Sequence, residues 1–380
     1  MVKRICIRAL DSSQCFSVAC RLLWICVVVG LSLSAVELRG SDAGLCGGIA
    51  CGWGDEATSS LPAAEQSRHH EVYLRGSGVQ RGRRLQGTIE DMPGEALIFR
   101  TIAGNRERLR IGEIAELRFG RSPQWEEGLA LREAGDVAGA AKSIRAAMGV
   151  ESRAWALREL RGMLAGLLRE QGAYEECLEE VQRILDSDAD SRHVIEIPLV
   201  WDEQVPVVER MPAGAVDLES KSELRRLIAA SSLLGRVELR EACEQEFRQQ
   251  MLNGRGTLKQ LAEIQTWRSK LLAADELTVF EVDGWQDRSQ EFARPVRAAA
   301  AIVVAQADLL LHREDRALEG FLWCALVGAP DRATNVIALN RALAVMERTG
   351  RTGGAAVMER ELRRVQTDGS GGEPAGPMTE

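Results

Sequence analysis

The sequence is poor in aromatic residues, which make up only 4% of its 380 residues. Ala, Leu, Glu and Arg recur instead, and this mixture favours helix over sheet. The net charge of −8 argues against a protein that coats nucleic acid non-specifically. With 45% hydrophobic and 27% charged residues, the composition excludes global disorder and a multispan membrane protein.

Motifs that carry chemistry are also missing from the sequence. It contains no G-x-S-x-G, no P-loop, no dinucleotide-binding fingerprint and no histidine pair at metal-binding spacing. His69 and His70 are adjacent, so in a strand they would point to opposite faces and could not chelate one ion. We therefore expect no catalytic residue, no metal and no cofactor, and a protein that is not an enzyme. A hydrolase with a dispersed site would instead show a deep pocket with converging carboxylates.

The N-terminus has the layout of a secretory signal peptide. Basic residues precede an apolar run at 22–36, and a polar stretch follows. The run is about 15 residues long and falls short of the ~20 that a spanning helix needs. We expect residues 1–43 to be a signal peptide and the protein to be periplasmic or secreted. The alternatives are an inner-membrane anchor formed by residues 22–36, or a start site that adds translated upstream sequence.

The nine cysteines do not predict a disulfide framework, because four of them lie in or before the apolar run. Cys46 and Cys51 are close enough to form a disulfide in an oxidising compartment. Cys177, Cys243 and Cys324 stand alone in apolar helical patterns, which is typical of small core residues. Residues 44–68 have no apolar period and are predicted to be a flexible linker.

Between residues 69 and 121 apolar and polar residues alternate in five short segments separated by turns. This pattern indicates a small antiparallel barrel or a strongly bent sheet. The spacing of Val72, Leu74 and Gly76, and then of Gly87 and Ile89, resembles the strand signature of Sm-like and SH3-like small barrels.

The same segment is rich in arginine, which suggests a basic surface for RNA, another phosphate-bearing polymer or an anionic lipid face. Alternation alone also places such residues on the solvated face of strands. Only Tyr73 and Phe99 could stack on bases, and both fit equally well in the core. The candidate basic surface consists of Arg75, Arg83, Arg84, Arg106, Arg108 and Arg110.

From Trp125 onward the apolar period becomes helical. Two stretches, 37 residues apart, share a glycine, a small residue five positions later and a larger apolar residue after that. We place the glycines at helix-helix turns and the small residues where paired helices approach closely. On these residues the chain resembles a tetratricopeptide-repeat (TPR-like) protein. The two stretches are marked by Gly135, Ala140 and Ile144 and by Gly172, Cys177 and Val181, and poorer units by Ala305, Ala317 and Phe321 and by Gly350, Ala355 and Leu362.

The predicted fold is α+β and mainly α: a small antiparallel β-barrel at 69–121, then a TPR-like or HEAT-like α-solenoid at 122–366. A Pro-rich insertion at 198–217 is expected to lie extended over the solenoid with Trp201 as its anchor. Residues 367–380 are expected to form a disordered tail.

The TPR-like resemblance implies a non-catalytic scaffold or adaptor that holds a protein or peptide partner on its concave face. Helix phase places Arg132, Arg158 and Arg169 on that face. We expect no nucleic-acid partner, and membrane contact only through an uncleaved N-terminal segment.

Overall fold

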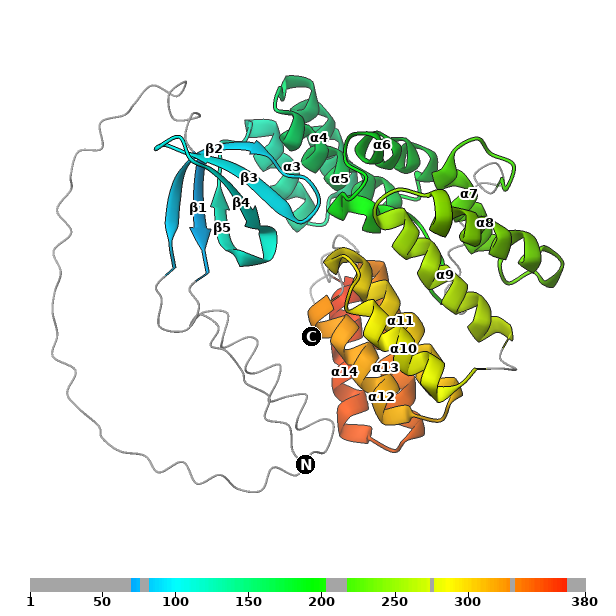
Figure 1. The fold of residues 1–380 in the computed structure, drawn as a ribbon. Helices are drawn as coiled ribbons and strands as arrows, with labels where there is room; N and C mark the ends of the chain where they lie inside the picture. Colours follow the sequence, from blue (N-terminus) through cyan, green and yellow to red (C-terminus); the bar gives the residue numbers. More distant parts are fainter. Residues whose placement is uncertain (1–69, 76–81, 203–216, 274–276, 329–331, 368–380) are drawn as a thin grey trace, which may run out of the picture.

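The computed structural model describes residues 70–75, 82–202, 217–273, 277–328 and 332–367. A small sheet leads into a long series of helices (Figure 1), and the prediction of a mainly helical chain with five antiparallel strands is confirmed. The predicted signal peptide and linker, Cys46, Cys51 and residues 368–380 lie outside the described ranges. Within those ranges, none of the helices is both long and apolar enough to cross a bilayer.

The five strands form one antiparallel sheet in the order β4-β3-β2-β1-β5. β4 and β5 therefore occupy opposite edges, although only the three-residue turn η1 joins them. In a flat sheet these edges would lie about 19 Å apart, whereas the connection can span only about 14 Å. The sheet must therefore curve strongly. The elements are β1 His70–Leu74, β2 Arg84–Asp91, β3 Ala96–Thr101, β4 Arg106–Arg110, η1 Ile111–Glu113 and β5 Ile114–Arg118.

The apolar face of the sheet packs against the first helices. Val72 and Phe99 are fully buried on this face. Phe119, which follows β5, lies edge-on to Trp155 with ring centroids 5.2 Å apart, and its centroid is 5.4 Å from that of Trp125. This aromatic cluster joins the sheet to the helices in one continuous core.

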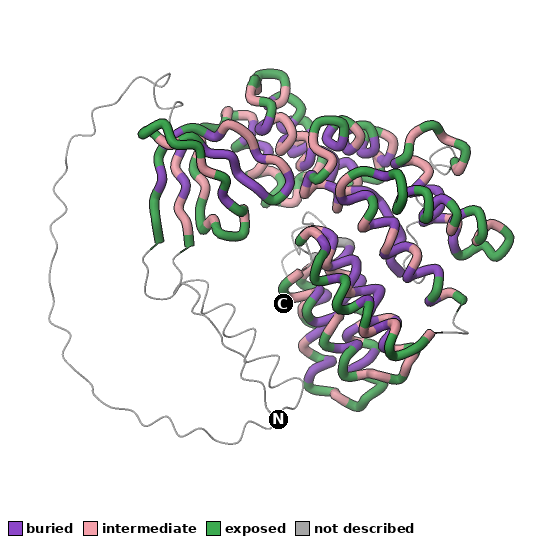
Figure 2. Tube along the Cα trace, viewed as in Figure 1, coloured by how far each residue is buried: buried purple, intermediate pink, exposed green. Residues whose placement is uncertain are grey.

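Most helices form antiparallel pairs that follow one another along an arc, and the last pairs return towards the sheet (Figure 1). Buried residues line the surfaces where helices face one another, while exposed residues gather at the turns (Figure 2). The helices are α3 Pro123–Glu133, α4 Val137–Val150, α5 Ala154–Glu170, α6 Tyr174–Ser187, α7 Glu223–Leu233, α8 Arg240–Asn253, α9 Thr257–Ala273, α10 Val279–Ser289, α11 Arg294–Leu310, α12 Glu314–Trp323, α13 Arg332–Arg348 and α14 Thr352–Thr367, with short turns η2 Arg192–Glu196, η5 Val237–Leu239 and the π-helical η6 Cys324–Gly328.

Four helix-helix turns share one backbone geometry. Gly135, Gly172 and Gly350 have φ of 81°, 75° and 73°, and His312 holds the same position after α11 with φ of 58°. In each turn the N–H of the following residue donates to the carbonyl five residues earlier at 2.8 to 2.9 Å, which is the Schellman arrangement. The prediction that Gly135 and Gly172 lie at helix-helix turns is confirmed, and a histidine replaces glycine in the third such pair.

Small residues allow each of these helix pairs to approach closely. Ala140, Cys177 and Ala317 are fully buried five positions after their turn residues. On the opposing helix α3, a Cβ atom at Gly128 would lie 2.7 Å from Ile144 Cδ1, too close for a real contact. The sequence spacing therefore identifies where the paired helices touch.

After α6 the chain runs between α5 and α6 on one side and α11 on the other. We call residues 192–202 the inner segment; it comprises η2 and six extended residues. Ser231 Oγ accepts a hydrogen bond from Val200 N at 3.0 Å, and Gln265 donates to Val200 O at 2.9 Å. Gln306 donates to Trp201 O at 3.0 Å. Helix side chains thus satisfy the backbone of this segment.

The end of the inner segment is fixed by a buried ion pair. Only 1% of the Asp202 side chain is exposed, and it pairs with Arg341 of α13. Trp201 is buried, so its expected role as a packing anchor is confirmed. The expectation that the segment lies over the solenoid is wrong for residues 198–202, which run between helices. The rest of the Pro-rich insertion, except residue 217, lies outside the described residues. The segment fills part of the inner side of the arc.

Candidate binding cavities

Two of the three predicted partner-binding arginines hold the chain's own segments. Arg158 of α5 pairs with Asp91 of β2. Arg169 donates to Ile195 O at 2.9 Å and pairs with Glu196 at 3.1 Å, both in the inner segment. Arg132, the third, lines a cavity instead.

This cavity, which we call the junction cavity, has a volume of about 540 Å³. Seven elements surround it: the end of β4, η1, the C-terminal turn of α3, the middle of α5, the inner segment, the N-terminus of α11 and the π-helical turn η6. Its size suits a small molecule or a few side chains of a partner. Met163, Ile195, Pro295 and Val327 supply its apolar surface.

Four arginines give the junction cavity its charge: Arg110, Arg132, Arg192 and Arg294. Within the described residues, the guanidinium groups of Arg132 and Arg294 have no carboxylate within 4.0 Å. Arg110 approaches Glu113 only to 3.7 Å. The cavity therefore carries cationic groups that the protein itself leaves uncompensated.

Both carboxylates that line the junction cavity already have partners. Glu95 Oε1 accepts a hydrogen bond from Arg294 N at 2.9 Å, at the N-terminus of α11. Glu196 pairs with Arg169 at 3.1 Å. The Glu95 contact joins residues 199 positions apart, so the cavity forms where the arc of helices meets the sheet.

A buried carboxylate supports the wall of the junction cavity. Glu159 of α5 pairs with Arg192, and His193 Nε2 lies 3.3 Å from Glu159 Oε1. Burial alone would raise the pKa of Glu159, but the neighbouring His193 imidazole and the Arg192 charge lower this pKa below its ordinary value. Gly162 makes room for the imidazole, since a Cβ there would lie 2.1 Å from His193 Nδ1.

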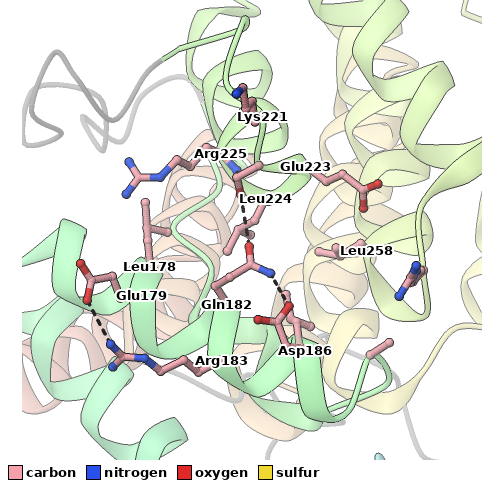
Figure 3. A pocket seen from close by; sticks show the side chains of 14 residues that line it. Leu178, Glu179, Gln182, Arg183, Asp186, Lys221, Glu223, Leu224, Arg225 and Leu258 are labelled. Atoms are coloured by element: carbon pink, nitrogen blue, oxygen red, sulfur yellow. Dashed lines mark hydrogen bonds and ion pairs between the residues drawn. The ribbon is translucent and has the colours of Figure 1, made fainter.

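A second, larger cavity of about 790 Å³ separates α6 from the start of α7 and α9 (Figure 3). One polar bridge crosses it: Ser222 Oγ donates to Gln182 Oε1 at 3.2 Å. Within α6, Gln182 in turn donates to Asp186 at 2.9 Å. Its charges of opposite sign lie close together, as in the pair of Arg183 and Glu179 at 3.4 Å. Because its charges are mixed, this cavity favours ligands of one charge less strongly than the arginine-rich junction cavity does.

The predicted basic surface of the sheet is partly neutralised. Arg84 pairs with Glu71, Arg83 with Glu107 at 2.7 Å, and Arg106 with Glu90 at 2.8 Å. According to the strand register, one face of the sheet carries Arg84, Arg106, Arg108 and Arg110. Arg75 instead follows the end of β1, where its backbone N–H donates to Glu113 O at 2.8 Å. Paired residues in an antiparallel sheet project from the same face.

Cysteine chemistry and metal binding find little support in the described part of the chain. No group of three or more His, Cys, Asp or Glu residues in it is placed to hold a metal ion. Cys177, Cys243 and Cys324 are buried and form no disulfide within the described residues, and their burial agrees with their apolar setting. Burial raises the pKa of Cys177 to about 12 and that of Cys243 to about 11, which suppresses their thiolate forms.

Sequence reasoning found Arg132 but missed Arg192, His193 and Arg294. The Arg294-Pro295 pair does signal a helix start, because proline is favoured in the first turn. Nothing local shows which distant element this helix end would meet.

Comparisons with known proteins add no further constraint. No protein-family model, no curated protein and no solved structure matches this chain.

Proposed function

We propose that this chain is a non-catalytic scaffold or adaptor, a TPR-like α-solenoid that binds an acidic segment of a partner protein in the junction cavity. The observation that carries the proposal is the pair of uncompensated guanidinium groups, Arg132 and Arg294, beside an apolar surface. Guanidinium groups bind carboxylates through paired, charge-assisted hydrogen bonds. Export of the protein, which the apolar run at 22–36 suggests, is part of the same proposal.

The repeated turn supports a TPR-like solenoid. The first two hairpins place Gly135 and Gly172 37 residues apart, and the last two place His312 and Gly350 38 residues apart. A single helix pair cannot bury its apolar faces alone, so equally spaced pairs favour stacking. The strong curvature of the sheet similarly supports an Sm-like or SH3-like barrel.

The inner segment argues for the junction cavity as the place of entry. Residues 192–202 already cover part of the inner side of the arc and are bound there by buried side chains. A partner can reach the junction cavity without displacing them. Arg132 remains a candidate contact, whereas Arg158 and Arg169 act in holding the protein's own chain.

A peptide-binding measurement tests the proposal. The probes are short fluorescein-labelled peptides in which Glu alternates with Leu, with Lys-Leu peptides as the charge control, and the readout is anisotropy. We expect Arg132→Glu and Arg294→Glu each to weaken binding of the acidic peptides about tenfold or more, because each reverses a charge at the site. Arg236→Glu is the matched control, since Arg236 is exposed on the α7–α8 turn and is not among the residues that line the cavity. Equal binding of acidic and basic peptides, or equal effects of all three variants, would refute the proposal.

The alternative, binding of nucleic acid through the sheet, is less well supported. Tyr73 is the candidate stacking residue that is not buried in the core, but the guanidinium groups of Arg118 and Arg84 lie 5.0 and 5.7 Å from its ring centroid. Phe99 is fully buried. Single-stranded nucleic acid is bound largely by stacking on accessible aromatic rings, whereas Phe99 is buried and Tyr73 already contacts two guanidinium groups.

A further inference from the structure

One face of the sheet gathers arginine side chains, and we call it the arginine face. The strand register pairs Tyr73 with Arg84, Thr88 with Arg100, and Arg100 with Arg106. Side chains of paired residues, and of residues two apart in a strand, project from the same face. The arginine face therefore carries six arginines: Arg84, Arg100, Arg106, Arg108, Arg110 and Arg118.

The arginine face has an excess of positive charge. Three carboxylates on this face, Glu71, Glu90 and Glu116, pair with four of its six arginines. Arg110 approaches Glu113 of η1 only to 3.7 Å. Arg108 is exposed and has no carboxylate within 4.0 Å in the described part of the chain. The whole chain carries a net charge of −8, so this face is opposite in sign to the protein as a whole.

An apolar residue lies at the tip of the same hairpin. Ile102, in the turn between β3 and β4, is 63% exposed. It follows Arg100 by two residues and precedes Arg106 by four, so guanidinium groups flank it on both strands. Gly104, with φ of 85°, supplies the left-handed residue of the turn, and its N–H donates to Thr101 O at 2.8 Å. Water exposure of this side chain is unfavourable, and a purely ionic partner would not relieve it.

We propose that the arginine face binds an anionic lipid surface, with Ile102 inserted among the headgroups. Cationic side chains around a small apolar tip match a bilayer interface, where phosphate groups border acyl chains. The sheet stands at one end of the described part of the molecule (Figure 1), and its opposite, apolar face is the one that packs against the helices. A nucleic acid or polyphosphate would use the arginines but would gain nothing from Ile102. This proposal does not depend on the junction cavity.

Vesicle co-sedimentation of the full chain tests the idea. The probes are phosphatidylcholine vesicles with and without phosphatidylglycerol, and the quantity compared is the ratio of the two partition coefficients. This ratio cancels any charge-independent partitioning by the apolar run at 22–36. Arg108→Glu should reduce the ratio about tenfold, since each basic residue near an anionic surface contributes several-fold in affinity. High salt should reduce it as well.

Ile102→Asn separates a lipid surface from a polymer, because it removes the apolar side chain without changing the charge of the face. It should weaken vesicle binding several-fold and leave polyphosphate binding unchanged, whereas Val237→Asn, a change at a residue 76% exposed before α8, should affect neither. Unchanged thermal melts would show that the variants fold, because Arg108 and Ile102 are exposed side chains. The proposal is overturned if the ratio is the same for wild type and Arg108→Glu. It is also overturned if Ile102→Asn binds vesicles as wild type does, or if polyphosphate binds the face and vesicles do not.

Discussion

Replacing His312 with glycine should stabilise the protein. His312 has a φ of 58°, a conformation that costs an L-residue about 1–2 kcal/mol. Its side chain is exposed, and within the described residues it makes no hydrogen bond or ion pair, so the substitution removes no contact. Glycine enlarges the unfolded ensemble, which offsets about 0.4–1 kcal/mol of the gain. The expected net gain in free energy of unfolding is about 0.5–1 kcal/mol.

The reverse change, from glycine to an L-residue at an equivalent turn, should destabilise the protein. A Cβ at Gly172 would meet no atom within 4 Å, so Gly172→Ala introduces backbone strain at φ of 75° and no clash. We expect a loss of about 1 kcal/mol. Gly284→Ala is the matched control, because its Cβ also meets nothing within 4 Å but the residue lies inside α10. There alanine should stabilise by up to about 1 kcal/mol through its higher helix propensity.

Urea unfolding followed by circular dichroism measures all three effects, with m-values compared to ensure that the same transition is observed. A change of 1 kcal/mol corresponds to about 2–4 °C in Tm for a folded region of this size. The reasoning fails if His312→Gly lowers stability, or if Gly172→Ala and Gly284→Ala change it in the same direction. Either result would mean that the turn conformation does not set the preference for glycine.

Three further outcomes follow from the junction cavity and the core. Gly162→Ala should destabilise strongly through its overlap with the His193 ring, and His193→Ala in the same chain should restore part of the loss in urea unfolding. Because the pKa of Glu159 is lowered in the folded state, its stabilisation is present above its ordinary pKa of 4.5 and is lost as pH falls through the folded value. As pH falls below 4.5, the urea midpoint of wild type should therefore decrease more than that of Glu159→Gln, which has no carboxyl group to protonate at this position. The Cys177 thiol, with its pKa raised to about 12, should react with iodoacetamide only after unfolding, and modification of the native protein would contradict its burial.

The elements that the sequence predicts well are those set by neighbouring residues. Alternation of apolar residues identified all five strands, because one face of the sheet is buried against the helices. Glycine at the helix ends identified the turns at Gly135 and Gly172. The equivalent turn at His312 was not predicted, because the hairpin tolerates a strained residue there and histidine does not indicate a helix end as glycine does.

The junction cavity could not be predicted in the same way. Arg110, Arg132 and Arg294 come from three elements that are distant in the sequence, and each element alone is an ordinary amphipathic segment. Helix phase indicates that Arg132 faces inward, but it says nothing about the element opposite. Arg158 and Arg169 have the same inward phase, and the chain uses both to hold its own segments.

Two glutamines on apolar helix faces do indicate the inner segment in the sequence. Gln306 interrupts the strongly apolar α11, and in the structure its amide donates to Trp201 O. Gln265 is likewise fully buried in α9 and donates to Val200 O. An extended segment enclosed by helices has no neighbouring strand to satisfy its backbone, and buried polar backbone groups must find partners. Isolated glutamines on apolar helix faces therefore indicate an enclosed extended segment, and a partner that enters this side of the arc must bind beside that segment or compete with these amides.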